Sequence, residues 1–326
     1  MIMNKTIIKK LIFSFTFLWV FILSSFISTY SVRANFEKAL VEKMFEIPLD
    51  AKLPESLKKY EKIQYLGNQS VQTFEVIGNL ESDRTLIIYP GLKGVYYYVE
   101  AIATNSQLLN YYSKIITFNY QSQGLTSGKP SQQSIVELGQ VVYNHYSNTS
   151  NKTNNKTNSQ TVSTNNIDSI NNNGVGSNYD NITLACLSNG AIPCTYLRIN
   201  PNTKVKLIHP FLSSSCIIDN IYTNYYDYDK LLKTWLQAKR SLDDTKRVEM
   251  IKERKDWLKS IYPMSKQAEF LYVNTKIGPN FQVYIANQDD YFTTPQNLEF
   301  FPKAEFTGAI SHTEISEEKL QNILMN

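Results

Sequence analysis

Short, mostly apolar runs alternate with longer amphipathic segments along this chain. Residues 62–66 and 71–77 are separated by Gly67-Asn68, which predicts an antiparallel pair of strands. Later runs are rich in β-branched residues, as is typical of strands buried in a parallel sheet. These runs are residues 85–89, 114–118, 182–186 and 281–286, and a helical pattern covers residues 134–146. The alternation predicts an α/β fold with a mostly parallel central sheet flanked by helices.

The run at residues 182–186 leads into a tight turn that contains Ser188. Gly190 keeps the turn small, and a helical pattern begins at Ala191. A strand, a serine in a sharp turn and a helix form a nucleophile elbow, which raises the hydroxyl above the strand end at the positive end of the helix. Cys186 stands where such elbows usually have glycine. Ser188 is the candidate nucleophile, and an ordinary strand–turn–helix is the alternative.

The first 34 residues have the layout of an export signal. Three lysines precede an uncharged apolar run at residues 11–27, and the residues before Asn35 allow cleavage after Ala34. The run is also long enough to stay as a single membrane anchor. In both cases the basic end stays in the cytoplasm and the remainder lies outside it. We therefore expect an exported or membrane-anchored protein.

Residues 35–326 are enough for one α/β domain. The net charge of +4 is too small to indicate nucleic-acid binding. Cys186, Cys194 and Cys216 are odd in number and have no metal or redox spacing, which favours free thiols. The three histidines are scattered, and no zinc motif occurs. The sequence therefore predicts neither a metal nor an organic cofactor.

Residues 147–180 interrupt the domain with a stretch of mostly Asn, Ser and Thr. The stretch has no apolar period, so it cannot bury enough surface to order itself. It joins a helix to the strand before Ser188, and such connections lie at the edge of a parallel sheet opposite the active site. We expect a disordered insertion that takes no part in the chemistry.

The segment at residues 118–131 reads FNYQSQGLTSGKPS. It resembles the FxYxxxGxSxGxPS loop of serine hydrolases of the α/β-hydrolase superfamily, those with monoacylglycerol-lipase-like or esterase-like cores. Gln121 and Ser122 replace the usual arginine and glycine, and Thr126 replaces a serine. Residues 205–213 resemble the sixth strand of that family, which ends in a Pro-Phe pair. The resemblance implies the α/β-hydrolase fold and identifies residues 214–279 as a helical cap between the sixth and seventh strands.

The same resemblance assigns the groups that would surround Ser188. The strand at residues 85–89 ends in Pro90-Gly91-Leu92, where such hydrolases have an oxyanion-hole donor. The backbone N–H groups of Leu92 and Asn189 are therefore the predicted oxyanion hole.

The acid and the base follow Ser188 in the order that hydrolases use, serine, aspartate and then histidine. Counting from the end of the strand at residues 281–286 selects Asp289 as the predicted acid, because the sheet fixes the strand end. Counting back from Pro295 gives Asp290 as the alternative. His312 is the predicted base. His145 and His209 are predicted to be structural.

These assignments predict a serine hydrolase that cleaves a lipid ester or a small acyl ester through an acyl-enzyme. Two alternatives remain open at this stage. One is a non-catalytic exported binding protein of the same fold, and the other is an acyltransferase of the same fold. Membrane association through the N-terminal segment is compatible with the hydrolase and with both alternatives.

Overall fold

The computed structural model describes residues 53–91, 95–150, 181–213, 277–289, 291–312 and 314–326, with residues 216 and 249 as single positions. The predicted signal or anchor and almost all of the predicted insertion and cap lie outside these residues. So do two predicted site residues, Leu92 and Asp290. Within the described ranges, no helix is long and apolar enough to span a membrane.

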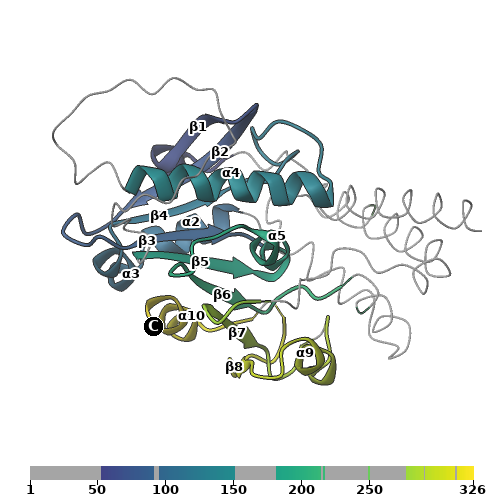
Figure 1. Cartoon of the computed structure of the whole chain (residues 1–326). Coiled ribbons are helices and arrows are strands. Elements are labelled where there is room, and N and C mark those ends of the chain that lie inside the picture. Colours follow the sequence, from purple (N-terminus) through teal and green to yellow (C-terminus); the bar gives the residue numbers. More distant parts are fainter. Residues whose placement is uncertain are drawn as a thin grey trace, which may run out of the picture.

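The described strands form a single eight-stranded sheet in the order β1-β2-β4-β3-β5-β6-β7-β8 (Figure 1). β2 is antiparallel to both β1 and β4, and the pairs from β4 to β8 are parallel. The predicted mostly parallel sheet is therefore confirmed. The strands are β1 (Glu61–Leu66), β2 (Gln69–Ile77), β3 (Thr85–Tyr89), β4 (Lys114–Phe118), β5 (Ile182–Leu187), β6 (Lys204–Ile208), β7 (Phe281–Ile285) and β8 (Glu305–Phe306).

Helices cover both faces of the sheet, which explains why its central strands are apolar throughout. Leu86 and Ile88 of β3 pack in one core with α2 (Val95–Ala103), α3 (Ser106–Tyr111) and α10 (Glu317–Met325). Ile87 and Tyr89 alternate with them and pack in the other core with α4 (Gln132–Ser150) and α5 (Ala191–Tyr196) (Figure 1). Three further short helices are also present in the described ranges, the 3-10 helices η1 (Glu55–Tyr60) and η3 (Ser188–Gly190) and the α-helix α9 (Thr294–Phe300).

A buried lysine of β6 anchors the last helix, α10. The Lys206 ammonium donates to the carbonyl oxygens of Ile323 and Leu324, which belong to the last turn of that helix. Burial, and to a smaller extent the neighbouring Lys204, lowers the pKa of Lys206 to about 8. The last carbonyls of a helix have no partners within the helix, so these hydrogen bonds hold α10 against the sheet.

Candidate active site

The turn after β5 has the geometry of an elbow. Ser188 has a φ of 50°, a conformation that non-glycine residues rarely adopt, and it begins a 3-10 turn that extends to Gly190. A Cβ atom at position 190 would collide with the carbonyl oxygen of Tyr89 in β3. Glycine is therefore required there because the turn passes directly against the neighbouring strand.

A disulfide joins Cys186 to Cys194 behind this turn. The prediction of free thiols is wrong for these two residues, whereas Cys216 is a thiol outside the bridge. Alternation along β5 turns Cys186 toward α5, the helix that contains Cys194. With a sequence separation of 8, such a bridge contributes about 2–3 kcal/mol by constraining the unfolded chain. It ties together the strand and the helix that form the elbow.

Three of the predicted side chains lie in hydrogen-bond contact. The Ser188 Oγ atom lies 2.9 Å from Nε2 of His312, and Nδ1 of His312 lies 2.8 Å from Oδ2 of Asp289. A carboxylate only accepts hydrogen bonds, so Nδ1 carries the proton and Nε2 is left to accept from the serine hydroxyl. This is the tautomer that a general base needs in order to take a proton from Ser188.

The carboxylate of Asp289 is held by the chain that follows it. Its Oδ1 atom accepts from the backbone N–H groups of Tyr291 and Phe292, at 2.8 and 2.9 Å. Burial alone would raise the pKa of this carboxyl, but the contact with His312 and the two backbone hydrogen bonds outweigh it and lower the pKa. Asp289 is therefore ionised at neutral pH although its side chain is only 1% exposed.

Other residues fix the position of His312. The rings of Tyr291 and Phe292 pack edge-on against its imidazole, with ring centroids 4.7 and 5.5 Å away. His209 donates from Nδ1 to the backbone carbonyl of His312 at 2.8 Å, and its Nε2 lies 2.8 Å from the Thr307 hydroxyl. The structural role predicted for His209 is therefore to hold the backbone of His312 in place. Its position just after β6 is the sequence signal, because the carboxyl ends of parallel strands meet at one edge of the sheet.

The remaining predicted site residues are described only in part. Asn189 follows Ser188 in the 3-10 turn and is buried, and its predicted role as a backbone donor stays a prediction. A Cβ atom at Gly91 would lie 2.9 Å from Cβ of Ser188, so the loop after β3 reaches the serine. Leu92 and Asp290 lie outside the described residues, and their predicted roles stay predictions.

The three histidines lie in two places. His145 is on α4, where its ring packs edge-on against Tyr146. His209 and His312 lie together, with ring centroids 6.0 Å apart. In the part of the chain that the structure describes, no group of three or more His, Cys, Asp or Glu side chains is placed to hold a metal ion. The chemistry of the described site is that of a hydroxyl, an imidazole and a carboxylate.

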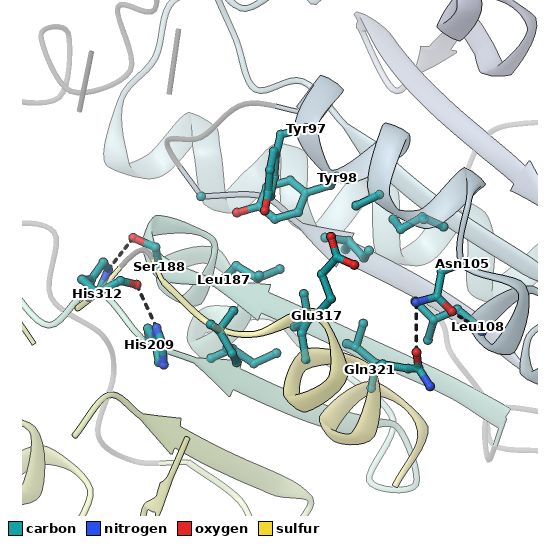
Figure 2. Close-up of a pocket in the computed structure, with 18 of the residues that line it drawn as sticks. Tyr97, Tyr98, Asn105, Leu108, Leu187, Ser188, His209, His312, Glu317 and Gln321 are labelled. Carbon is teal, nitrogen blue, oxygen red and sulfur yellow. Dashed lines mark hydrogen bonds between the residues drawn. The ribbon is translucent and has the colours of Figure 1, made fainter. Parts of the chain in front are cut away.

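A cavity of about 200 Å³ opens beside Ser188 and His312. Figure 2 shows Ser188, His209 and His312 at one end of it, with α2 and α10 on either side. Tyr97 and Tyr98 of α2 are among its lining residues. The candidate nucleophile is thus accessible from a pocket that can receive a substrate.

No family model and no curated protein sequence matches this chain. Its structure is similar to that of an esterase from Pyrococcus furiosus, with 13% identity, 83% of this chain and 92% of that chain covered, and a TM-score of 0.49. An esterase from Exiguobacterium antarcticum aligns at 10% identity over 80% of this chain and 96% of that chain, with a TM-score of 0.45. An alpha-beta serine hydrolase homologue from Coxiella burnetii aligns at 14% identity over 81% and 95%, with a TM-score of 0.43.

Proposed function

We propose that this protein, which has the α/β-hydrolase fold, cleaves carboxylic esters with Ser188 as its nucleophile. The observation that carries the proposal is the series of hydrogen bonds from Ser188 through His312 to Asp289. The series begins at a strained elbow and faces a cavity. A serine hydroxyl, a general base and an orienting carboxylate are the three groups that acyl transfer through a covalent intermediate requires.

The first half of the reaction forms the acyl-enzyme. Nε2 of His312 takes the hydroxyl proton while Oγ of Ser188 bonds to the ester carbonyl carbon, and the carbonyl oxygen becomes an oxyanion. The backbone N–H groups of Asn189 and Leu92 are the proposed donors to this oxyanion. When the ester C–O bond breaks, Nε2–H of His312 gives its proton to the leaving alcohol oxygen.

In the second half, water replaces the alcohol. His312 takes a proton from the water as its oxygen attacks the acyl carbon, and it returns the proton to Oγ of Ser188 when the acid leaves. Asp289 stabilises the imidazolium that forms in both halves, and its lowered pKa supports this role because the carboxylate stays charged. With an acceptor alcohol in place of water, the same steps describe the acyltransferase alternative.

Covalent labelling tests the proposal. A fluorophosphonate probe should add to the purified, folded protein at neutral to mildly alkaline pH, and peptide mapping by mass spectrometry should place the adduct on Ser188. Heat-denatured protein is the control, because activation of the serine depends on the folded site. Folded protein that remains unlabelled would contradict the proposal and favour a binding protein of the same fold.

We also propose that the protein is exported. The lysines ahead of the apolar run at residues 11–27 support this, and so does the Cys186–Cys194 disulfide, since disulfides persist mainly in oxidising compartments. N-terminal sequencing of the mature protein should begin at or near Asn35. An intact Met1 in the membrane fraction would indicate an anchor, and an intact Met1 in the soluble cytoplasm would contradict export.

A further inference from the structure

The cavity beside Ser188 follows one face of the sheet. Its floor consists of apolar side chains from three adjacent strands or strand ends, Ile88, Leu187 and Ile208. These three side chains point to the same face, the one that packs against α2, α3 and α10. The cavity thus leads from the nucleophile into the space between these helices (Figure 2).

The walls of this cavity are apolar as well. α2 and α3 contribute one wall, and α10 contributes the opposite one. Among the described lining residues, Glu317 is the single acidic side chain, it is exposed, and there is no lysine or arginine. A negatively charged group on the acyl chain would therefore find no lysine or arginine among these residues. The apolar wall residues are Tyr98, Ile102, Leu108, Leu320 and Leu324.

Polar side chains lie at the end that is farthest from Ser188 in Figure 2. Nδ2 of Asn105 donates to Oε1 of Gln321 at 3.1 Å, and Nε2 of Gln321 donates to Gln107. Asn105 also caps α3, because its side chain accepts from the backbone N–H of Leu108. These bonds join α10 to the start of α3 at this end of the cavity.

The volume of the cavity indicates the length of its ligand. A methylene group is similar in size to a water molecule, whose share of liquid volume is about 30 Å³. A cavity of about 200 Å³ therefore has room for a chain of several methylene groups. With the carbonyl carbon at Ser188, this favours an acyl chain of medium length over an acetyl group.

We propose that this cavity binds the acyl chain of the substrate, and that the substrate is an ester of an uncharged, medium-chain fatty acid, for which the eight-carbon acid is the working length. This inference rests on the proposed esterase function. The chain lies along the sheet between α2 and α10, with its methyl end at the Asn105–Gln321 hydrogen bond. The alcohol portion of the ester lies on the other side of Ser188, outside this cavity.

A series of p-nitrophenyl esters, used below their aggregation limits, measures the length of the site. Burial of each added methylene is expected to raise kcat/KM by about fourfold, from the butanoate to the octanoate. The dodecanoate and hexadecanoate are expected to react more slowly than the octanoate, since the proposal places the methyl end of the chain at the Asn105–Gln321 hydrogen bond. A profile that keeps rising to the hexadecanoate, or that does not depend on length, would overturn the inference.

Ala101 of α2 lines the cavity and is the position at which to block it. Ala101→Trp is expected to lower kcat/KM for the octanoate at least tenfold more than for the acetate, which moves the optimum to shorter chains. The neighbouring Glu100 is exposed and does not line the cavity, so Glu100→Trp is the matched control and should keep the wild-type profile. Equal losses for all esters in a folded Ala101→Trp protein would contradict the inference.

A second variant tests the end of the cavity that is far from Ser188, and it removes side-chain volume there instead of adding it. Gln321→Ala removes the hydrogen bond from Asn105 and is expected to move the optimum to ten or twelve carbons. An unchanged optimum in a folded Gln321→Ala protein would show that this end does not limit the chain. If the protein turns over esters but the variants do not shift the chain-length optimum, only the assignment of the cavity to the acyl chain is contradicted. No turnover together with no fluorophosphonate labelling would contradict the esterase function, and this inference with it.

Discussion

Replacing Ser188 by alanine is expected to lower kcat for a chromogenic ester by about a millionfold, the loss typical of removing a nucleophile that works with its base as one unit. Without Oγ no acyl-enzyme forms, and His312 has no hydroxyl from which to take a proton. Residual turnover would come from binding and from the oxyanion donors alone. Steady-state kinetics on purified protein measure the effect.

The control for this variant is Ser106→Ala, which changes an exposed serine at the start of α3. Its kcat should equal that of the wild-type protein. A Ser188→Ala protein that keeps more than about one hundredth of the wild-type kcat, a loss that a nucleophile should exceed by far, would show that another group attacks the ester.

Asp289→Asn is expected to lower kcat by about ten-thousandfold. The asparagine oxygen can still accept from the backbone N–H groups of Tyr291 and Phe292, so the loop should keep its conformation. Its NH2 group, however, would face Nδ1 of His312 as a second donor. His312 would then carry its proton on Nε2 and could not act as a base toward Ser188.

Asp290→Asn is the matched comparison for that variant. By the register of β7, position 289 contacts His312, and the change at position 290 should leave most of the turnover. Kinetics of both variants with the same ester decide between the two carboxylates. Full activity in Asp289→Asn together with a large loss in Asp290→Asn would reverse the assignment.

The sequence alone determined most of the sheet and its turns, because apolar patterns and turn residues act within short segments of the chain. A run that is apolar on both faces is stable only inside a sheet covered on both sides, so residues 85–89 and 114–118 predicted β3 and β4 with their observed limits. Gly67-Asn68 fixed the hairpin that pairs Leu66 with Gln69. The small residue at Gly190 marked the elbow, because only glycine fits against β3 there.

The sequence also selected the three side chains that the structure brings into contact. The reason is that the ends of adjacent parallel strands meet at one edge of the sheet. A residue that follows each of several strands is therefore close to the others, whatever the length of chain between them. Counting from the strand end distinguished Asp289 from Asp290 because the sheet, and not the loop, fixes that position.

Only the tertiary structure decided the contacts that depend on the packing of separate elements. The spacing of Cys186 and Cys194 carries no disulfide signal, and the two thiols meet because the elbow folds α5 back over β5. His209 supports His312 across 103 residues of chain. The cavity has walls from α2 and α10, and the Asn105–Gln321 hydrogen bond at its far end joins residues 216 positions apart. Hydrophobic pattern specifies which face of an element is buried, but the distance between two buried faces depends on how whole helices pack against the sheet.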